Sequence, residues 1–195
     1  MYSVQGNGGV PVSWAAVALT RTAVVDTALE ILRESGLPGM SMRTLAGRLH
    51  VQPSALYWHV PSKQALLTAV AERILATMGA VGAAETAGAE LRVVATALRT
   101  AVTAYPDGAE IVALGLAAGA ENPVADVVAE TCRRHGLEGR ASGWTTALTA
   151  FVLGLSLEQQ THHNLSVADP STPPGSFDAR FEEGLEALLA GPASA

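Results

Sequence analysis

The sequence predicts an all-α protein, and three observations support that class. Alanine and leucine dominate a chain of 195 residues, of which 49% are hydrophobic and only 5% aromatic. β-branched residues form none of the alternating runs that mark half-buried strands. Apolar residues instead recur every three or four positions, between helix-capping residues, glycines and prolines. A chain of this length can bury a substantial core, so we expect a folded helical protein.

One amphipathic helix followed by two short ones is expected in the first third of the chain. Thr20 can cap the first, which spans about 20–35 before Gly36 ends it. Ser41 can cap a second, short helix. Pro53 suits the first position of a third helix of about two turns, because proline lacks the N–H that would be unpaired there anyway.

Three more helices follow in the middle of the chain. Pro61 and Ser62 stop the third helix and start a fourth, whose apolar stripe continues to Met78. A fifth helix ends at Pro106. Asp107 can cap a short sixth helix that continues to about residue 118.

The last three helices are marked by strong start and stop residues. Asn122 followed by Pro123 begins the seventh, and Gly136 ends it. The eighth is long and covers roughly 140–163. After a proline-rich loop, Ser176 can cap the last helix.

The eighth and last helices each carry an apolar stripe for which we expect no remaining partner within the chain. Pairing each helix with its symmetry mate would make a four-helix interface, so we expect a homodimer. The stripes are Trp144, Leu148, Phe151 and Leu155 on the eighth helix, and Phe177, Phe181, Leu185 and Leu188 on the last.

The net charge of −6 argues at first against a nucleic-acid partner, because phosphate contacts supply most of the affinity for DNA. The charge is divided unevenly, however. Residues 1–73 carry a net charge of +2, and the remaining residues carry −8. Only the N-terminal part can approach a phosphate backbone without strong repulsion, so we expect the two parts to do different jobs.

Cellular location follows from charge and cysteine usage. Residues 1–19 form an N-terminal arm without the basic segment that a secretory signal requires. The single cysteine, Cys132, excludes an intramolecular disulfide and favours a reducing, cytoplasmic location. The uncharged stretch between Arg140 and Glu158 is rich in serine and threonine and shorter than a membrane span. We therefore expect a buried helix there and no membrane partner.

Several segments of the N-terminal unit together resemble one known domain. They are TRTAVV at 20–25, ALEIL at 28–32, GLPGMSMRTLA at 36–46 and LYWHV at 56–60, followed by Lys63 and the leucine pair at 66–67. This pattern resembles the helix-turn-helix DNA-binding domain of the tetracycline-repressor (TetR) family. The resemblance implies a DNA-binding domain over 20–66 and an effector-binding and dimerisation domain over 67–195.

The residues of the third helix suit DNA reading on physical grounds as well. Gln52 precedes it, and Pro53, Ser54 and Ala55 are small enough for the backbone to enter a major groove about 12 Å wide. Arg43, early in the second helix, is the best candidate for a long-reach base or phosphate contact. His50 stands where many relatives have glycine, and it must adopt a left-handed or similar backbone if the turn is retained.

The residues after Leu56 have competing interpretations. Tyr57, His59 and Lys63 lie where they can donate to phosphates. Tyr57 and Trp58 could instead be core anchors, and the resemblance implies that Trp58 contacts DNA and is also partly such an anchor. His59 could cap a helix, and Lys63 could be ordinary solvated surface.

The C-terminal half has the apolar, alanine-rich helix faces of an enclosed small-molecule pocket. Its segments 106–109 and 154–160 are similar to the tetracycline-repressor subgroup. Where that subgroup has a histidine that binds the magnesium–drug complex, this chain has Val112, which argues against both metal and tetracycline. The expected pocket residues are Leu98, Val102, Tyr105, Val112, Leu116, Val128, Trp144 and Phe151.

Glu158, His162 and His163 share a region of the eighth helix, and Glu158 and His162 lie one turn apart. Two ligands are too few for a metal site. A helix-end ion pair or dimer contact, or ligand recognition, is the better interpretation. We expect no metal and no cofactor.

The sequence therefore predicts a homodimeric transcriptional repressor that binds double-stranded DNA. Two recognition helices about 34–36 Å apart predict a palindromic operator, released when a small-molecule effector binds. A ligand-independent DNA-binding protein or an activator is an alternative. A small helical enzyme is a further alternative, but no nucleophile–base pair or paired carboxylates support it, so we expect no enzymatic activity.

Overall fold

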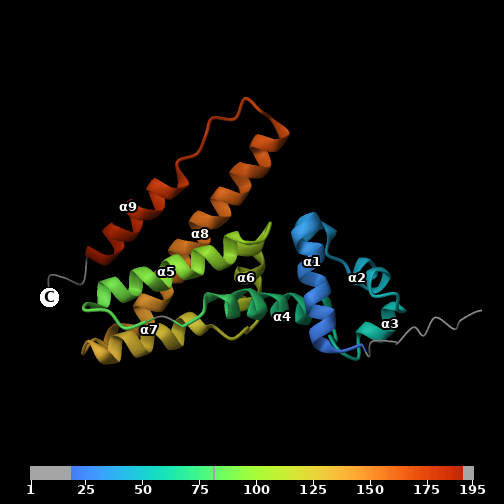
Figure 1. The fold of residues 1–195 in the computed structure, drawn as a ribbon, viewed down its shortest axis with the longest axis horizontal. Coiled ribbons are helices and arrows are strands. Elements are labelled where there is room, and N and C mark those ends of the chain that lie inside the picture. Colours follow the sequence, from blue (N-terminus) through green and yellow to red (C-terminus); the bar gives the residue numbers. More distant parts are fainter. Residues whose placement is uncertain (1–18, 81, 191–195) are drawn as a thin grey trace, which may run out of the picture.

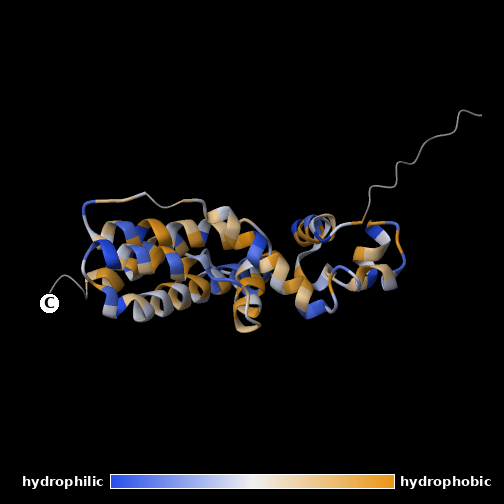
Figure 2. Cartoon of the chain, turned by 90° about the horizontal axis from the view of Figure 1, so that it is seen from below, coloured by the Kyte–Doolittle hydropathy of each residue, from blue (hydrophilic) through white to orange (hydrophobic). Residues whose placement is uncertain are grey.

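The computed structural model describes residues 19–80 and 82–190, and all regular secondary structure in these residues is helical. Figure 1 shows two lobes, with α1 to α3 in one and α5 to α9 in the other. The helix α4 runs from the small lobe into the large one. Figure 2, a view from below, shows the same elongated arrangement. The N-terminal arm expected at 1–19 lies outside the described residues, apart from Leu19.

The small lobe contains three helices, and α4 leads out of it. The boundary expected between 66 and 67 falls within α4, so this helix is shared by both parts of the chain. The bounds are Arg21–Gly39 for α1, Met42–Arg48 for α2, Pro53–Leu56 for α3 and Lys63–Leu75 for α4.

In the described residues the large lobe contains five α-helices and a short 3-10 helix at Glu138–Arg140, and the longest helix is α8. It continues to Ala168, five residues beyond the end expected from the sequence, because residues 164–168 contain no glycine or proline that would end it. The bounds are Ala87–Thr103 for α5, Gly108–Ala117 for α6, Pro123–Arg134 for α7, Ala141–Ala168 for α8 and Phe177–Ala190 for α9.

Side-chain caps fix the starts of several helices. Thr20, Ser41 and Ser62 each accept a hydrogen bond from the backbone N–H three residues later, and Asn122 accepts one from Val124. These four expectations are confirmed. Each cap satisfies an N–H that has no partner within its helix.

The expectations at two helix boundaries have different outcomes. Asp107 occupies the N-cap position of α6, but contrary to expectation its carboxylate does not cap that helix. It accepts instead from the Leu37 N–H, as described below. The expectation for Gly36 is confirmed, because its backbone is non-helical (φ 62°, ψ −169°) and ends the regular run that begins at Arg21. A short helical segment that contains Pro38 follows this kink and completes α1 at Gly39.

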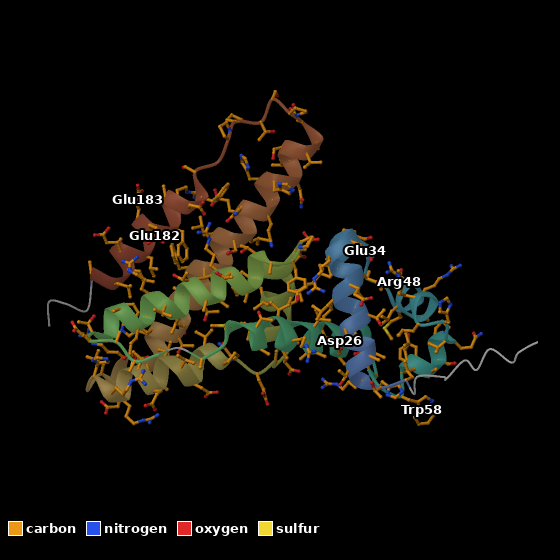
Figure 3. The ribbon with its side chains drawn as sticks, in the orientation of Figure 1. Asp26, Glu34, Arg48, Trp58, Glu182 and Glu183 are labelled. Atoms are coloured by element: carbon orange, nitrogen blue, oxygen red, sulfur yellow. The ribbon has the colours of Figure 1, made fainter. Side chains whose placement is uncertain are left out.

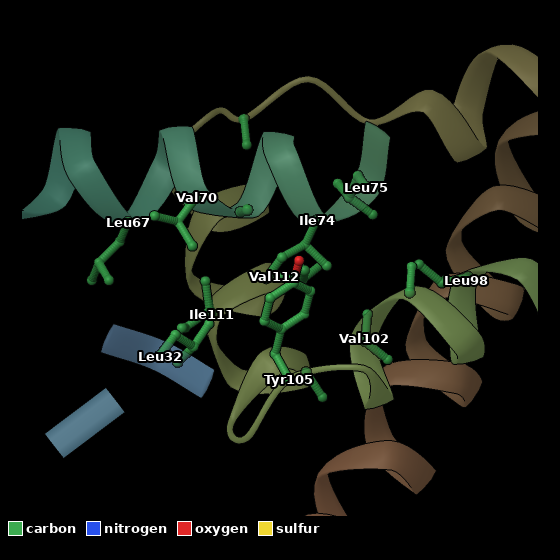
Figure 4. Packing of buried hydrophobic residues seen from close by; sticks show 14 of the residues in the cluster. Leu32, Leu67, Val70, Ile74, Leu75, Leu98, Val102, Tyr105, Ile111 and Val112 are labelled. Carbon is green, nitrogen blue, oxygen red and sulfur yellow. The ribbon is translucent and has the colours of Figure 1, made fainter. Parts of the chain in front are cut away.

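The two lobes share one core where α4 crosses α6. Ile74 and Val70 of α4 are directed toward Val112 of α6, and Leu32 of α1 lies close by (Figure 4). The helices approach so closely that a Cβ atom at Gly115 would collide with the Cβ atom of Ala71. A displacement of α6 must therefore move α4 or open this contact, because close-packed interiors transmit strain.

The apolar stripes of α8 and α9 have partners within the chain, contrary to expectation. Leu148 and Leu155 are buried where α8 packs on the other helices of the large lobe. Phe151 stacks on Phe181 of α9, with ring centroids 5.7 Å apart. Phe177 and Leu185 are buried as well. The apolar side chains that α8 leaves exposed are Leu157, Leu165 and Val167.

No helix in the described ranges is both long and apolar enough to cross a membrane. Cys132 is fully buried in α7, and burial raises the pKa of its thiol.

Candidate DNA-binding site

A left-handed turn places α3 across α2. His50 has φ 54°, as the retained turn required. The turn is closed by hydrogen bonds from the His50 N–H to the Gly47 carbonyl (3.2 Å) and from the Val51 N–H to the Ala46 carbonyl (3.0 Å). The side chain of His50 is exposed, so it tolerates this backbone without needing space in the core.

One side of α3 is buried against the small lobe, and the opposite side is exposed to solvent. Leu56 and Val60 are buried against the core of the small lobe, together with Leu45 of α2. On the outer side, Gln52, Pro53 and Ser54 are exposed, and Ala55 is half-buried. The apolar underside fixes the orientation of α3, and its small outer residues are offered to solvent.

Aromatic side chains follow directly after α3. Tyr57 is 50% exposed and Trp58 is 90% exposed. Figure 3 shows Trp58 at the outer edge of the small lobe, away from the rest of the molecule. The expectation that Trp58 is partly a core anchor is therefore wrong, because Leu56 and Val60 already fill that role.

His59 is half-buried and does not cap α4. That position belongs to Ser62, whose hydroxyl accepts from the Ala65 N–H at 3.0 Å. The interpretation of His59 as the cap of α4 is therefore not supported. Lys63, in the first turn of α4, is exposed.

The cations of the small lobe fall into two groups. Arg48 makes a bidentate contact with Glu34 of α1, which lowers the pKa of that carboxyl (Figure 3). Arg43 and Lys63 are exposed, and neither makes an ion pair with any residue in the described ranges. Their positive charge is therefore available to a phosphate backbone beside α3.

Known proteins share this arrangement. The model of the family described as "Bacterial regulatory proteins, tetR family" matches residues 24–70, which include α2, α3 and the turn between them. The tetracycline repressor protein class C of Escherichia coli is 34% identical over 197 aligned residues, covering 89% of this chain and 90% of that protein. The chain belongs to the TetR family.

Solved structures of similar proteins cover nearly the same length. BioQ of Mycobacterium smegmatis is similar with a TM-score of 0.79 and 30% identity, covering 89% of this chain and 97% of that one. A structure of BioQ with its double-stranded DNA operator has a TM-score of 0.76 and 29% identity, covering 91% and 99%. A tetracycline repressor variant from Acinetobacter baumannii AYE, in complex with minocycline, has a TM-score of 0.75 and 34% identity, covering 89% and 96%. The TetR-family protein described here is a DNA-binding transcriptional repressor and not an enzyme.

The eight residues expected to line an effector pocket lie in two environments of this TetR-family protein. Four of them have no exposed surface and pack in the core, and Tyr105 is also buried. Leu116, Trp144 and Phe151 are half-buried. The four are Leu98, Val102, Val112 and Val128.

Two of these residues border surface hollows in the described part of the chain. Tyr105 borders a hollow of about 300 Å³ between the α5–α6 corner and α8. Leu116 borders another, of about 370 Å³, between α6 and α8. The second hollow is also lined by Thr149, whose hydroxyl oxygen is buried without a hydrogen-bond partner among the described residues.

Glu158 and His162 link α8 to α9. Both carboxylate oxygens of Glu158 accept from Arg180 (2.7 and 2.8 Å), which lowers the pKa of Glu158. The His162 Nε2 lies 2.8 Å from the carbonyl oxygen of Pro173, and its ring meets Phe177 edge-on at 5.3 Å. The ion pair of Glu158 with Arg180 therefore forms within one chain. No group of three or more metal-ligating side chains occurs among the described residues.

A buried carboxylate was missed by the sequence analysis. Glu90 of α5 accepts from the Ala84 N–H (3.0 Å) and contacts Arg134 and His135 at the end of α7. Desolvation alone would raise the pKa of Glu90, but these hydrogen bonds lower it to about 2. The only local clue was a lone glutamate on an apolar helix face.

The α5–α6 corner reaches back to α1. Asp107 Oδ2 accepts a hydrogen bond from the Leu37 N–H at 2.8 Å. Arg33 Nη2 donates to the Tyr105 hydroxyl at 2.8 Å, and its guanidinium lies 4.6 Å from the centre of that ring. These polar contacts join the two lobes beside the α4–α6 core.

Proposed function

We propose that this TetR-family protein acts as a homodimer on a palindromic operator in the cytoplasm, and that a small-molecule effector releases it. The observation that carries the DNA part is the outward presentation of α3. Ser54, Tyr57 and Lys63 are exposed, and the turn at His50 orients the helix. That BioQ, of similar fold, binds a double-stranded operator supports the same role for α3 here.

Specific roles follow from chemistry for the exposed residues. Arg43 has the reach and the paired donors to contact a guanine edge or a phosphate. In the proposed complex, Tyr57, His59 and Lys63 contact phosphates and so position the helix. Gln52 and the small residues Pro53, Ser54 and Ala55 face the bases, and Trp58 offers an apolar surface to the sugar–phosphate backbone or a thymine methyl.

Dimer formation is supported by the apolar side chains that α8 leaves exposed to solvent. Leu157, Leu165 and Val167 are exposed on one helix, although burying such side chains is favourable by roughly 1.5–3 kcal/mol each. A second copy of the chain is the partner that two-fold symmetry provides. Two recognition helices would then face successive major grooves about 34–36 Å apart.

The effector is proposed to enter between α6 and α8. The hollow beside Leu116 is lined by the unpaired hydroxyl of Thr149, and an unsatisfied buried hydroxyl costs roughly 1–3 kcal/mol. A ligand that hydrogen-bonds there would remove this cost. To reach Val112 and the other core residues expected in the pocket, the ligand must separate the helices. Complexes of similar proteins with minocycline and with (S)-DNPA support effector control.

A ligand-independent regulator is the second candidate, and the filled core favours it. Leu98, Val102, Val112 and Val128 leave no exposed surface between the helices. Reporter repression in the presence of a small-molecule collection separates the two candidates. Effector control predicts a compound that relieves repression and loses this effect when Leu116→Trp fills the hollow. Leu114→Trp, on the same helix but outside that hollow, is the control. Repression that no compound relieves favours the second candidate.

The DNA part is tested by selecting ligands from a random double-stranded library. We expect recovery of an inverted repeat and a complex containing two protein chains per repeat, measured by native mass spectrometry. Recovery of unrelated sequences, or one chain per selected site, would contradict the proposal.

A further inference from the structure

The hollow of about 300 Å³ beside Tyr105, called the junction hollow below, lies in the large lobe next to the contacts that join this lobe to α1. Its walls come from the end of α5, from the α5–α6 corner and from the second half of α8. It is separate from the hollow beside Leu116 and shares no lining residue with it. The polar side chains that matter for its chemistry are Asp107, Gln159, Gln160, His163 and Asn164.

One wall of this junction hollow is rigid. The Gln160 amide donates to the carbonyl oxygens of Val102 (3.2 Å) and Tyr105 (2.9 Å) and accepts from the Ala109 N–H (3.3 Å). All three bonds tie α8 to the corner. A hollow with a preformed wall loses little entropy when it orders a ligand.

The electrostatics of the junction hollow favour a cation. Asp107 is the only carboxylate among the lining residues, and no lysine or arginine lines it. One oxygen of Asp107 accepts from Leu37, which leaves the other for a ligand. Arg99 donates to the amide oxygen of the lining residue Gln159 at 3.0 Å, and its charge is paired with Asp178 at 2.7 Å.

Tyr105 is shared between the junction hollow and the contact with α1. Arg33 lies over the Tyr105 ring at 4.6 Å, and Tyr105 borders the junction hollow as well. In addition, Asp107 is one of two non-glycine residues with positive φ among those described (φ 56°). Left-handed backbone of this kind is costly and concentrates at functional positions.

We propose that the junction hollow binds a small organic ammonium ion. The ammonium group donates to the free oxygen of Asp107 and to the amide oxygen of Asn164. The apolar body of the ligand lies against Ala104 and Pro106, and the His163 ring covers it. The lining offers no cation for an anionic ligand. This site goes beyond the proposed effector pocket, and its occupation does not depend on DNA binding.

The test uses three probes of similar shape and different charge on the intact protein. They are 2-phenylethylammonium, the neutral 2-phenylethanol and the anion 3-phenylpropanoate. Binding is measured by calorimetry and located by amide chemical shifts. We expect the ammonium to bind about tenfold more tightly than the alcohol, as a charge-assisted hydrogen bond provides. The shifts should centre on Gln159, His163 and Asn164.

Two variants that each remove one negative charge make the test more specific. Asp107→Asn keeps an acceptor for Leu37 and tolerates left-handed backbone, so the fold is retained. It should weaken ammonium binding about tenfold. Glu183→Gln removes the same charge from exposed α9 and should change binding less than about twofold. Tighter binding of the anion, no ammonium binding, equal effects of the two variants, or shifts elsewhere would each overturn the proposal.

Discussion

The helix contacts of the large lobe and the surface around α3 in the small lobe use positive charge differently. In the large lobe, Arg92, Arg99 and Arg180 each bind a carboxylate of another helix, and Arg134 reaches the buried Glu90. In the small lobe, Arg43 and Lys63 beside α3 have no carboxylate partner among the described residues. Paired cations hold helices together, whereas unpaired ones leave their field to an outside partner. The difference explains how a chain with net charge −6 can bind DNA.

The largest expected effect on stability is at Glu90. The variant Glu90→Gln leaves Arg134 and His135 without their buried carboxylate, so we expect a loss of about 3 kcal/mol in the free energy of unfolding. Urea denaturation measures it. Operator affinity per folded molecule should change less than about twofold, since Glu90 lies in the large lobe. A large loss of affinity in a fully folded variant would contradict the separation of roles.

Acid sensitivity follows from the same residue. The pKa of Glu90 is lowered to about 2 in the folded protein, from an ordinary value near 4.5. Its contribution to stability is therefore present above about pH 4.5 and is lost as the pH falls toward 2. Between pH 4.5 and pH 2, the free energy of unfolding should fall less steeply with decreasing pH in Glu90→Gln than in the natural sequence. Urea denaturation at a series of pH values measures it. Parallel curves would mean that the carboxylate is not held as described.

Asp107 provides the next effect, because it joins the lobes. Asp107→Ala leaves the Leu37 N–H without its acceptor and keeps a costly left-handed backbone, so we expect about 2 kcal/mol of destabilisation. Asp107→Asn should cost less than about 1 kcal/mol, because asparagine accepts the bond and tolerates the backbone. Thermal denaturation compares the two. Equal losses of stability in the two variants would show that the hydrogen bond from the Leu37 N–H does not stabilise the contact between the lobes.

The small lobe should respond in affinity rather than stability. Lys63→Gln removes an unpaired cation beside α3, so we expect operator affinity to fall about fivefold, or roughly 1 kcal/mol. Arg140→Gln removes the same charge from an exposed position in the large lobe and serves as the matched control. Fluorescence anisotropy with the selected operator measures both. Equal losses would assign the effect to net charge alone.

The smallest effect is expected at His50. His50→Gly removes a side chain from left-handed backbone, so the free energy of unfolding should rise by about 0.5–1 kcal/mol. Operator affinity should stay within about twofold, because α3 keeps its orientation. Destabilisation would mean that the His50 side chain contributes a contact that outweighs the strain.

Local features were predictable from the sequence, and long-range partners were not. Thr20, Ser41 and Ser62 cap helices by accepting a hydrogen bond from the backbone N–H three residues later. Both partners lie in the same short segment, so the local sequence pattern is enough to predict the cap. The partner of Asp107 lies 70 residues away at Leu37. No local pattern distinguishes that contact from an ordinary cap.

The candidate site divides in the same way. The turn at His50 and the exposure of Ser54, Tyr57 and Lys63 agree with the sequence analysis. The 90% exposure of Trp58 does not agree, because a large aromatic residue is expected to be buried unless the residues that fill the core beside it, here Leu56 and Val60, are known. The stripes of α8 and α9 were assigned to a dimer because periodicity shows that a face is covered but not by which helix. Pairs such as Phe151 with Phe181 cover those faces within the chain.

The salt dependence of operator binding tests the account most directly. Each cation that neutralises a phosphate adds about 0.9 to the slope of log affinity against log salt. If Arg43 and Lys63 both contact phosphates in each subunit, their double replacement by glutamine should make the slope shallower by about 4 for a dimer. An unchanged slope, with the variant folded and dimeric, would mean that the surface around α3 does not face DNA.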